Sequence, residues 1–401
     1  HKARSEKFYC IGQRHKEMMM VRTKKIASLE KLLVCAGNFA NPSVMAAKAA
    51  GKKIVGIQYP EIPEEILIAA GCVPVLLRGT GATGTEYAEA YFRQLTCNYT
   101  RCTFDQILQG KWDFLDGAVI FNSCDHMRRI YDNWLLVPGK PKLSFLYSPK
   151  KRTPIAKGFW HLQIDAFVKE VAEKYGPVTK EGLAAAVKLT NERRRLQQEV
   201  YALQQGEAVY LTGTELLMVM LAAMSMPVEE YNSCLKALLA ELKAAGETMT
   251  PKVRLLFVGG HADSAEFYQA LESKRAQVVV DGMGFGTVAC HALIDETKDP
   301  LQAVEDFYFD GKPFTPRHFG TAKERMAYLH ELVRKYHVDG VVVARINMCD
   351  VWAMEQFMMR EYLTTEDIPL TELEVNYLPD GVGQIATRMQ AFVESIEARK
   401  H

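Results

Sequence analysis

One short residue pattern occurs twice in this chain, in two places far apart in the sequence. Residues 116–125 run from Asp-Gly through an apolar stretch to Cys-Asp, and residues 339–350 repeat that order. A short apolar run bounded by turn residues is typical of a buried strand in a parallel sheet. Cys124 and Cys349 then lie just past the carboxyl ends of two strands, where open α/β sheets bind ligands. The pattern predicts two α/β units that direct thiols at one object, which we expect to be a metal cluster rather than a disulfide.

The composition fits a folded protein of more than one domain and argues against several functional classes. The chain has 401 residues, of which 48% are hydrophobic and 24% are charged, and this length suggests two or three domains. A net charge of +1 gives no electrostatic argument for a nucleic-acid partner. No apolar run approaches the roughly 20 residues of a membrane span. The chain begins without Met or an apolar signal core, so we expect a truncated or tagged start and a cytoplasmic protein.

The cysteines do not suit a disulfide framework. The chain has nine of them, an odd number, and no pair shows the CxxC spacing of a zinc ribbon. Any cysteines that bind a metal must therefore converge in space from distant positions. We expect the others to be small buried hydrophobic residues, namely Cys35, Cys72, Cys234 and Cys290.

Strand-like and helix-like segments alternate in two regions, which are separated by a stretch without strand signals. We predict an α/β fold with two parallel-sheet domains of the Rossmann or flavodoxin type, and helical segments at the N-terminus and between the domains. A helix is expected over about Tyr91 to Leu108, before the strand that ends at Ile120. The expected division is a helical lead-in at 1–50, a first α/β domain at 51–160, a helical section at 161–250 and a second α/β domain at 251–401.

Four cysteines are candidates for the shared object: Cys97, Cys102, Cys124 and Cys349. Iron–sulfur clusters need thiolate ligands, usually four, in a partly dry cavity. Three thiolates would leave one iron open to water, substrate or a partner's ligand, by analogy with the open position of a catalytic zinc ion. The alternative is a set of unrelated cysteines, and the repeated pattern argues against that alternative.

Several motifs together resemble the benzoyl-CoA reductase and 2-hydroxyacyl-CoA dehydratase family. The motifs that carry the resemblance are residues 63–74, 97–101, 115–117, 124–129, 348–350 and 383–388. The resemblance implies two α/β domains and a [4Fe-4S] cluster on three cysteines, which map to Cys97, Cys124 and Cys349. It also implies an acyl-CoA substrate, a homologous sister subunit, and a separate ATP-hydrolysing iron–sulfur activator as the electron donor.

Two positions qualify the match to the family. Many members have a cysteine in an Asp-x-x-Cys-x-Gly stretch, whereas residues 281–286 of this chain contain no cysteine. Met283 in this stretch is a poor ligand for iron, so we do not expect an extra ligand or a double cluster. Cys102 competes with Cys97 as the first ligand, and only one of them should reach the cluster because positions i and i+5 do not share a helix face. We favour Cys97, because its Cys-x-Tyr-x-Arg context fits the family.

His126 and Glu65 are the candidate catalytic side chains. His126 follows a cluster cysteine and could donate a proton to a substrate that receives an electron, or it could be structural. Glu65 could act on the substrate, or it could be an ordinary acidic residue in the first turn of a helix. Asp125 could cap the helix that follows it. Arg128 and Arg129 could meet a CoA phosphate, but we favour carboxylate pairing at a subunit interface.

The remaining motifs narrow the function. Residues 282–286 are Gly-rich and follow a predicted strand, but they lack the GxGxxG spacing of a dinucleotide-binding turn. The sequence contains no Walker A motif, so we expect ATP hydrolysis on another subunit. Segments 124–129 and 145–151 are closest to ATP-dependent benzoyl-CoA reductase. The resemblance therefore implies an oxidoreductase subunit that passes low-potential electrons to an aromatic acyl-CoA in a dearomatising reduction. The alternatives are radical dehydration of an (R)-2-hydroxyacyl-CoA and a non-catalytic partner subunit that binds CoA.

Overall fold

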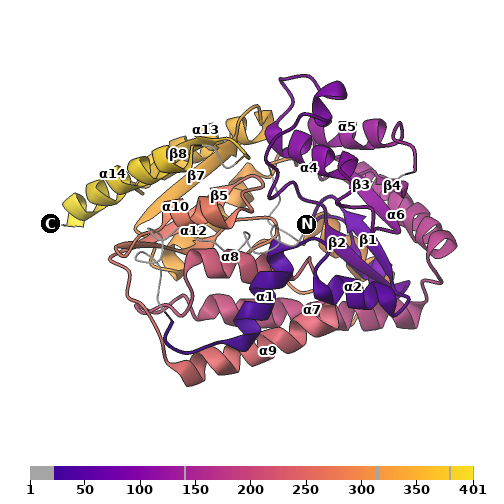
Figure 1. The fold of residues 1–401 in the computed structure, drawn as a ribbon, viewed down its shortest axis with the longest axis horizontal. Coiled ribbons are helices and arrows are strands. Elements are labelled where there is room, and N and C mark those ends of the chain that lie inside the picture. Colours follow the sequence, from indigo (N-terminus) through magenta and orange to yellow (C-terminus); the bar gives the residue numbers. More distant parts are fainter. Residues whose placement is uncertain (1–21, 140, 312–315, 379–380, 401) are drawn as a thin grey trace, which may run out of the picture.

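Two four-stranded parallel sheets form the core of the molecule (Figure 1). The computed structural model describes residues 22–139, 141–311, 316–378 and 381–400. The first sheet consists of β1 (Lys53–Ile57), β2 (Cys72–Leu76), β3 (Gly117–Phe121) and β4 (Lys142–Leu146). The second consists of β5 (Val253–Gly259), β6 (Ala276–Asp281), β7 (Gly340–Ile346) and β8 (Leu370–Val375). The predicted α/β class with two parallel sheets is confirmed.

The two sheets share one strand order. The first runs β2-β1-β3-β4 and the second runs β6-β5-β7-β8, so β1 corresponds to β5 and β3 to β7. Strand order reverses between β1 and β3 in the first sheet, and between β5 and β7 in the second. Crevices at the carboxyl ends of such reversal points are where open α/β sheets bind ligands.

Helices cover the sheets and join the two halves. The first half carries α1 (Ala27–Gly37), α2 (Pro42–Ala49), α3 (Glu64–Ala69), the short 3-10 helix η2 (Ala88–Ala90), α4 (Asn98–Leu108) and α5 (Asp125–Trp134). The connecting helices are α6 (Pro154–Lys174), α7 (Lys180–Ala202), α8 (Gly213–Ala222) and α9 (Val228–Ala245). The second half carries α10 (Ala265–Leu271), α11 (Pro300–Asp310), α12 (Ala322–Lys335), α13 (Asp350–Thr365) and α14 (Val382–Lys400).

The connecting helices contact both halves. Helix α7 packs against α3 of the first half and α11 of the second, and α8 packs against α1 and β6. In Figure 1, α7 and α9 run along one side of the molecule, beneath both sheets. The predicted domain boundaries stay predictions. Residues 1–21 of the expected helical lead-in, with Cys10, lie outside the described residues.

The repeated Asp-Gly pair has the same structural role in both halves. The Asp116 carboxylate accepts the backbone N–H of Ile54 at 2.8 Å, and the Asp339 carboxylate accepts that of Arg254 at 2.8 Å. Each aspartate also donates its own N–H to the carbonyl of the same neighbour. The aspartates therefore fix the register in which the central strand of each sheet begins.

The helix expected from about Tyr91 is wrong in its first turns, because α4 begins only at Asn98. Cys97 has an extended backbone with ψ of 143°, which ends any helix before it. The preceding segment folds back over α4, where Phe92 packs edge-to-face on Phe104 with ring centroids 5.2 Å apart. Burial of this aromatic pair outweighs the local preference for one longer helix.

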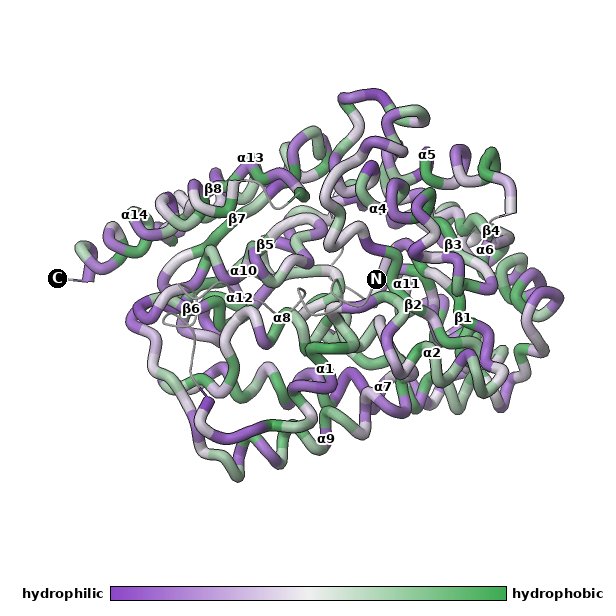
Figure 2. The backbone as a smooth tube through the Cα atoms, viewed as in Figure 1, coloured by the Kyte–Doolittle hydropathy of each residue, from purple (hydrophilic) through white to green (hydrophobic). Residues whose placement is uncertain are grey.

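Hydrophobic residues concentrate in the strands (Figure 2). Every residue of β2, β3, β5 and β6 is buried, as near-continuous apolar runs in a two-sided parallel sheet predict. None of the described helices combines the length and the hydropathy that crossing a bilayer requires.

Candidate functional site

Three of the candidate cysteines occupy the same position relative to a helix. Cys97, Cys124 and Cys349 are the N-cap residues of α4, α5 and α13, and none of them makes a side-chain capping hydrogen bond, although the Cys97 thiol lies 3.2 Å from the Thr100 hydroxyl. The first backbone N–H groups of a helix have no partner within the helix. Together with the helix dipole, they favour a thiolate or another anion at this end.

Cys124 and Cys349 each lie three residues past the end of a strand, but the two turns have different backbone hydrogen bonds. Cys124 follows β3 and Cys349 follows β7, and these are the corresponding strands of the two sheets. After β7, Met348 adopts a positive φ of 64°, which non-glycine residues rarely do. This tight turn lets the Cys349 N–H donate to the Ile346 carbonyl at 3.0 Å. The strained residue thus sets the position of the thiol.

The three thiols act electrostatically on one another. Burial raises the pKa of Cys97 to about 12; its hydrogen bond to Thr100 opposes this, and the charges of Cys349 and Cys124 raise it further. Burial also raises the pKa of Cys349, with Arg317 opposing and Cys124 adding to the rise. Cys97 therefore lies within electrostatic range of Cys124 and Cys349, and Cys349 lies within range of Cys124. A raised thiol pKa means that the thiol is protonated near neutral pH, so metal binding here would release a proton.

The three candidate thiols are not arranged as the compact ligand set of a single metal ion. Among the described residues, one group of three His, Cys, Asp or Glu side chains has all its ligand atoms within 4.8 Å of one another, and it contains no cysteine. The sulfur atoms of Cys97, Cys124 and Cys349 are therefore spread more widely than the ligands of one ion. A four-iron cluster binds each cysteine through a different iron atom and so needs wider spacing.

Cys102 faces a different environment. It is fully buried within α4 and packs against the loop after β2, where a Cβ added to Gly79 would lie 2.8 Å from the Cys102 Cβ. Burial raises its pKa to about 12, and the Asp105 charge raises it further. Since Cys97 caps the helix and Cys102 lies inside it, the two thiols do not share a surface.

A buried arginine supplies positive charge beside the thiols. Arg317 hydrogen-bonds to the Tyr59 hydroxyl and lies 4.4 Å from the centre of that ring. Burial works against its charge, but the Tyr59, Cys124 and Cys349 charges outweigh burial and raise the pKa of Arg317. A permanently charged guanidinium here would stabilise thiolates or an anionic cluster.

Lys150 holds the turn that leads into Cys124. Its Nζ donates to the carbonyls of Asn122 and, at 3.0 Å, Ser123. Burial lowers the pKa of Lys150 to about 8, and repulsion from Arg317 adds to this. Sequence reasoning missed both cations, because each comes from a loop far from the cysteine motifs in the chain.

His126 contacts the site, whereas Glu65 does not face the thiols. The Nδ1 of His126 accepts the backbone N–H of Cys97 at 3.2 Å, which joins the starts of α4 and α5. Glu65 is fully buried and pairs with Arg194 at 2.7 Å, while Thr190 and Tyr308 donate to it at 2.9 and 3.0 Å. Burial and Arg194 act oppositely on this carboxyl, burial raising and Arg194 lowering its pKa, and the pKa is lowered overall. Its partners lie on α7 and α11, so the structure places Glu65 in an interhelical ion-pair network.

The other charged candidates of α5 lie at the surface. Asp125 is 89% exposed and meets Arg128 at 3.5 Å, and Arg129 pairs with Asp132 at 2.8 Å. Asp125 is the first residue of α5 and makes no capping hydrogen bond. The expected capping role is therefore not found, and the arginines keep surface positions at which another molecule could reach them.

The Gly-rich turn at 282–286 uses its own donors internally. The Asp281 carboxylate accepts the N–H of Met283 at 2.9 Å and that of Thr287 at 3.3 Å. A Cβ added to Gly286 would lie 1.9 Å from the same carboxylate, so only glycine fits there. The turn closes around an aspartate rather than presenting these N–H groups to a phosphate.

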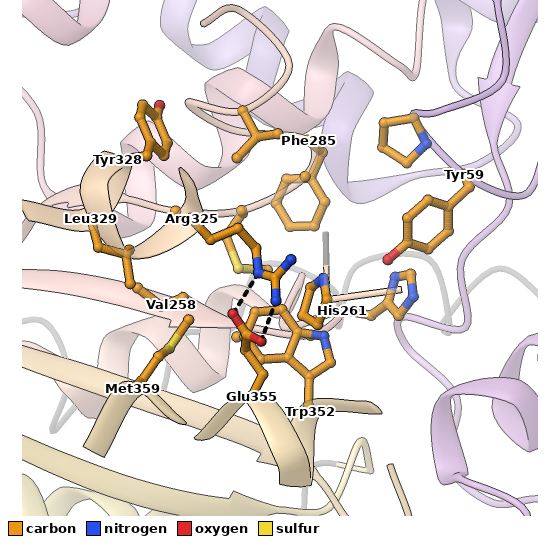
Figure 3. Close-up of a pocket in the computed structure, with 18 of the residues that line it drawn as sticks. Tyr59, Val258, His261, Phe285, Arg325, Tyr328, Leu329, Trp352, Glu355 and Met359 are labelled. Carbon is orange, nitrogen blue, oxygen red and sulfur yellow. Dashed lines mark hydrogen bonds and ion pairs between the residues drawn. The ribbon is translucent and has the colours of Figure 1, made fainter. Parts of the chain in front are cut away.

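A cavity opens at the carboxyl edge of the second sheet (Figure 3). It is lined by the end of β5 with His261, by the glycine turn with Phe285, by Trp352 of α13 and by Tyr59 of the first half. The His261 ring stacks on Tyr99 at 3.7 Å and meets Tyr59 edge-on at 5.0 Å. His261 follows β5 and Tyr59 follows β1, which are corresponding strands of the two sheets. The sequence alone does not show this correspondence, because it depends on the strand order.

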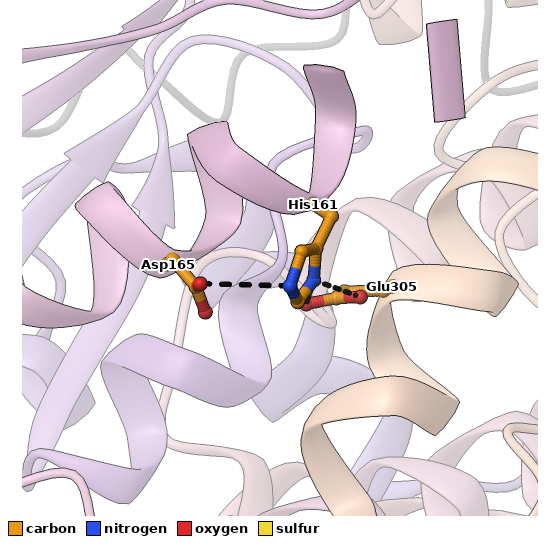
Figure 4. A group of neighbouring side chains, drawn as sticks. All are labelled: His161, Asp165 and Glu305. Carbon is orange, nitrogen blue, oxygen red and sulfur yellow. Dashed lines mark hydrogen bonds and ion pairs between the residues drawn. The ribbon is translucent and has the colours of Figure 1, made fainter. Parts of the chain in front are cut away.

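A second side-chain cluster lies away from the thiols, between α6 and α11 (Figure 4). The Nδ1 of His161 lies 3.0 Å from Glu305, and its Nε2 lies 3.6 Å from Asp165. Each ring nitrogen thus faces a different carboxylate. This arrangement suits a charged imidazolium that joins two helices, rather than a metal ligand.

Comparison with known proteins gives consistent matches over most of the chain. The family model described as 2-hydroxyglutaryl-CoA dehydratase, D-component, matches residues 61–396. The chain is 24% identical over 348 residues to the (R)-phenyllactyl-CoA dehydratase beta subunit of Clostridium sporogenes, covering 86% of this chain and 92% of the relative. It is 23% identical over 353 residues to a benzoyl-CoA reductase subunit of Thauera aromatica, covering 86% and 91%.

A third relative matches to a similar extent. The beta subunit of (R)-2-hydroxyglutaryl-CoA dehydratase from Acidaminococcus fermentans is 24% identical over 367 residues, covering 89% of this chain and 96% of the relative. All three relatives are named as subunits of enzymes that act on CoA thioesters. The family match includes the segments that carry Cys97, Cys124 and Cys349. The chain belongs to the family of the 2-hydroxyglutaryl-CoA dehydratase D-component, which also includes benzoyl-CoA reductase subunits.

Proposed function

We propose that this chain is the iron–sulfur subunit of an enzyme that acts on acyl-CoA thioesters by one-electron chemistry. Cys97, Cys124 and Cys349 would hold a [4Fe-4S] cluster, which supplies low-potential electron transfer when bound. The observation that carries the proposal is that three cysteines occupy the N-cap positions of three helices, two of them after corresponding strands of the two sheets, and that Cys97 and Cys349 are influenced by the charges of the other thiols.

The residues around the thiols fit such a group. The hydroxyl of Ser123 and the side-chain oxygen of Asn347 are buried and have no hydrogen-bond partner among the described residues. Both lie just before a proposed ligand in the chain, where polar groups often hydrogen-bond to the sulfur atoms of a cluster. Arg317 supplies a positive charge, and the uncapped helix ends supply further N–H donors.

His126 is the proposed proton donor of the site. Its Nδ1 already accepts the Cys97 N–H, so the neutral ring carries its proton on Nε2. That second nitrogen is the one free to exchange a proton with the substrate. Glu65 takes no part in this proposal, because its oxygens are held by Arg194, Thr190 and Tyr308.

Two chemistries fit this machinery. Reduction of an aromatic acyl-CoA to a cyclic diene consumes two electrons and two protons, and we propose it first, on the motifs at 124–129 and 145–151. Dehydration of a 2-hydroxyacyl-CoA loses water and returns its electron, and the matches to dehydratase subunits favour it equally. In either case we propose a homologous sister subunit and an ATP-hydrolysing activator, because the relatives are named as subunits.

The test is anaerobic purification of the chain with its sister subunit, followed by measurement of iron and acid-labile sulfide. About four of each per complex support the proposal, whereas near-zero content with intact cysteines contradicts it. Benzoyl-CoA and a 2-hydroxyacyl-CoA are then supplied separately with the activator and ATP. ATP consumption in proportion to product identifies a reductase, and many turnovers per electron identify a dehydratase.

A further inference from the structure

The cavity in Figure 3 shares helix α13 with the proposed cluster site, although none of the three cysteines lines it. Trp352 lines the cavity and stands on the first turn of α13, which Cys349 caps. Tyr59 lines it from the other half, and the Tyr59 hydroxyl is bound by Arg317, whose charge acts on Cys124 and Cys349. A molecule in the cavity would therefore contact the first turn of the helix that begins at Cys349.

Most of the side chains that line the cavity are apolar. Its walls include the aliphatic, thioether and aromatic side chains of Leu76, Val258, Met283, Phe285, Val288, Leu329 and Met359, together with the rings of Tyr59, Tyr328 and Trp352. A cavity of this composition gains free energy by removing apolar surface of a ligand from water.

The described charged side chains that line the cavity neutralise each other. Arg325 donates two hydrogen bonds to Glu355, from Nε at 2.6 Å and from Nη2 at 2.7 Å. Its Nη1 donates to the Thr321 hydroxyl at 2.6 Å. Both ions are more than nine-tenths buried. The guanidinium is thus fully engaged, and an incoming carboxylate would meet Glu355 without a cation to pair with.

Two polar atoms of the cavity lack partners. The Nε2 of His261 and the Nε1 of Trp352 are buried and have no hydrogen-bond partner among the described residues. Gly260 keeps them together, because a Cβ there would lie 3.0 Å from the Trp352 ring. Burial and the Arg317 charge hold the pKa of His261 well below its usual range, so the ring is neutral. The Trp352 Nε1–H is a donor, and the Nε2 of the neutral His261 ring is a donor in the tautomer that carries its proton there, so the two together suit a neutral carbonyl oxygen.

We propose that this cavity is the acyl pocket. It selects uncharged apolar acyl groups, aromatic or branched, over acyl groups that end in a carboxylate. Trp352 and His261 bind the carbonyl oxygen of the thioester. The inference rests on the proposed function, because that function supplies the acyl-CoA. It adds the class of acyl group and the residues that choose it.

Binding to the anaerobically purified complex tests the selection without requiring turnover. Phenylacetyl-CoA, glutaryl-CoA and free CoA are titrated by calorimetry. We expect phenylacetyl-CoA to bind at least about tenfold more tightly than glutaryl-CoA, because burial of an unpaired carboxylate is costly. Equal affinity for the two acyl-CoAs would overturn the inference.

Two variants of the ion pair sharpen the test. Glu355→Gln frees Arg325 to pair with a ligand carboxylate, so glutaryl-CoA should bind at least about tenfold more tightly than it does to the wild type. The matched control Arg325→Gln/Glu355→Gln removes the pair without freeing a cation, and should show no such gain. An equal gain in both, or in neither, would count against the pocket. Trp352→Phe should weaken phenylacetyl-CoA about tenfold while leaving free CoA unchanged.

Iron content separates this inference from the proposed function. A complex that contains iron but binds none of the acyl-CoAs through these residues overturns the pocket alone. A complex that shows the expected selectivity but contains no iron overturns the cluster assignment alone.

Discussion

The two halves of the molecule share a strand order and a strand–turn–cysteine–helix unit, yet they contribute differently to the site. The first half provides Cys97 and Cys124, and its α5 carries exposed arginines. The second half provides Cys349 and most of the cavity. The equivalent of the Cys97 loop is the glycine turn at 282–286, which closes on Asp281. The two halves share one architecture, but the first holds two of the three proposed cluster ligands and the second holds most of the proposed acyl pocket.

The largest expected effect comes from removing the candidate ligand thiol of the second half, Cys349. Cys349→Ser should abolish cluster assembly, because a hydroxyl is a poor substitute for a thiolate ligand. Iron and sulfide measured after anaerobic purification provide the test. Cys234→Ser is the control, since Cys234 is a buried residue of α9. Similar iron content in both variants would contradict the assignment.

The same measurement separates Cys97 from Cys102. Cys97→Ser should lose iron as Cys349→Ser does, because Cys97 caps α4 and is influenced by the other two thiols. Cys102→Ser should keep its iron, since this residue packs against the loop at Gly79. Loss of iron only in the Cys102 variant would reverse the choice between them.

His126 tests whether the first half also supplies a proton. His126→Asn keeps an acceptor near the Nδ1 position for the Cys97 N–H but removes the distal nitrogen. We expect wild-type iron content in this variant and a fall in turnover of about 100-fold. His126→Ala removes both functions and should also reduce iron retention. Full turnover in the His126→Asn variant would contradict the role of proton donor. It would leave His126 only the role of positioning Cys97 through its backbone N–H.

The sequence allowed prediction of what lies along one strand–turn–helix unit and of little that depends on contacts between units. Cys124 and Cys349 were identified because strand, turn and cysteine are adjacent in the chain. Arg317 and His261 were not, because their roles arise from packing between the halves. For Glu65 the sequence left a substrate role and a structural role open, because its partner Arg194 lies on a distant helix. The same physics explains why the helix expected from Tyr91 begins later than predicted.

The paired aspartates test whether the two sheets are equivalent in stability. Asp116→Ala and Asp339→Ala each remove the acceptor of a strand N–H, so each should lower the free energy of unfolding by about 1–2 kcal/mol. Chemical denaturation at neutral pH measures both.

Burial raises the pKa of Asp116, but the Ile54 N–H and Lys48 outweigh it, and the pKa is lowered overall. Its stabilisation is therefore present above the unfolded pKa of about 3.9 and is lost as pH falls through the folded value. A strongly unequal effect of the two substitutions would show that the sheets differ in how much they depend on this contact.

The smallest expected effect concerns the ion pairs through which the connecting helices contact the two halves. Helix α7 pairs with the first half through buried Glu64–Arg193 and Glu65–Arg194 ion pairs, whereas α6 reaches α11 of the second half through His161. The Glu305 hydrogen bond and the charges of Glu305 and Asp165 raise the pKa of His161.

This contact should therefore weaken with rising pH. Its stabilisation is complete below the unfolded histidine pKa of about 6.5 and is lost as pH rises through the higher folded value. Because the His161 side chain is 53% exposed, the effect should stay below about 1 kcal/mol. The measurement is the difference in unfolding free energy between wild type and His161→Gln from about pH 5 to about pH 9. His330→Gln serves as the control, since His330 lies 3.9 Å from Glu366, within the second half alone. A difference that grows with rising pH has the wrong sign for an imidazolium between two carboxylates, and would exclude that role for His161.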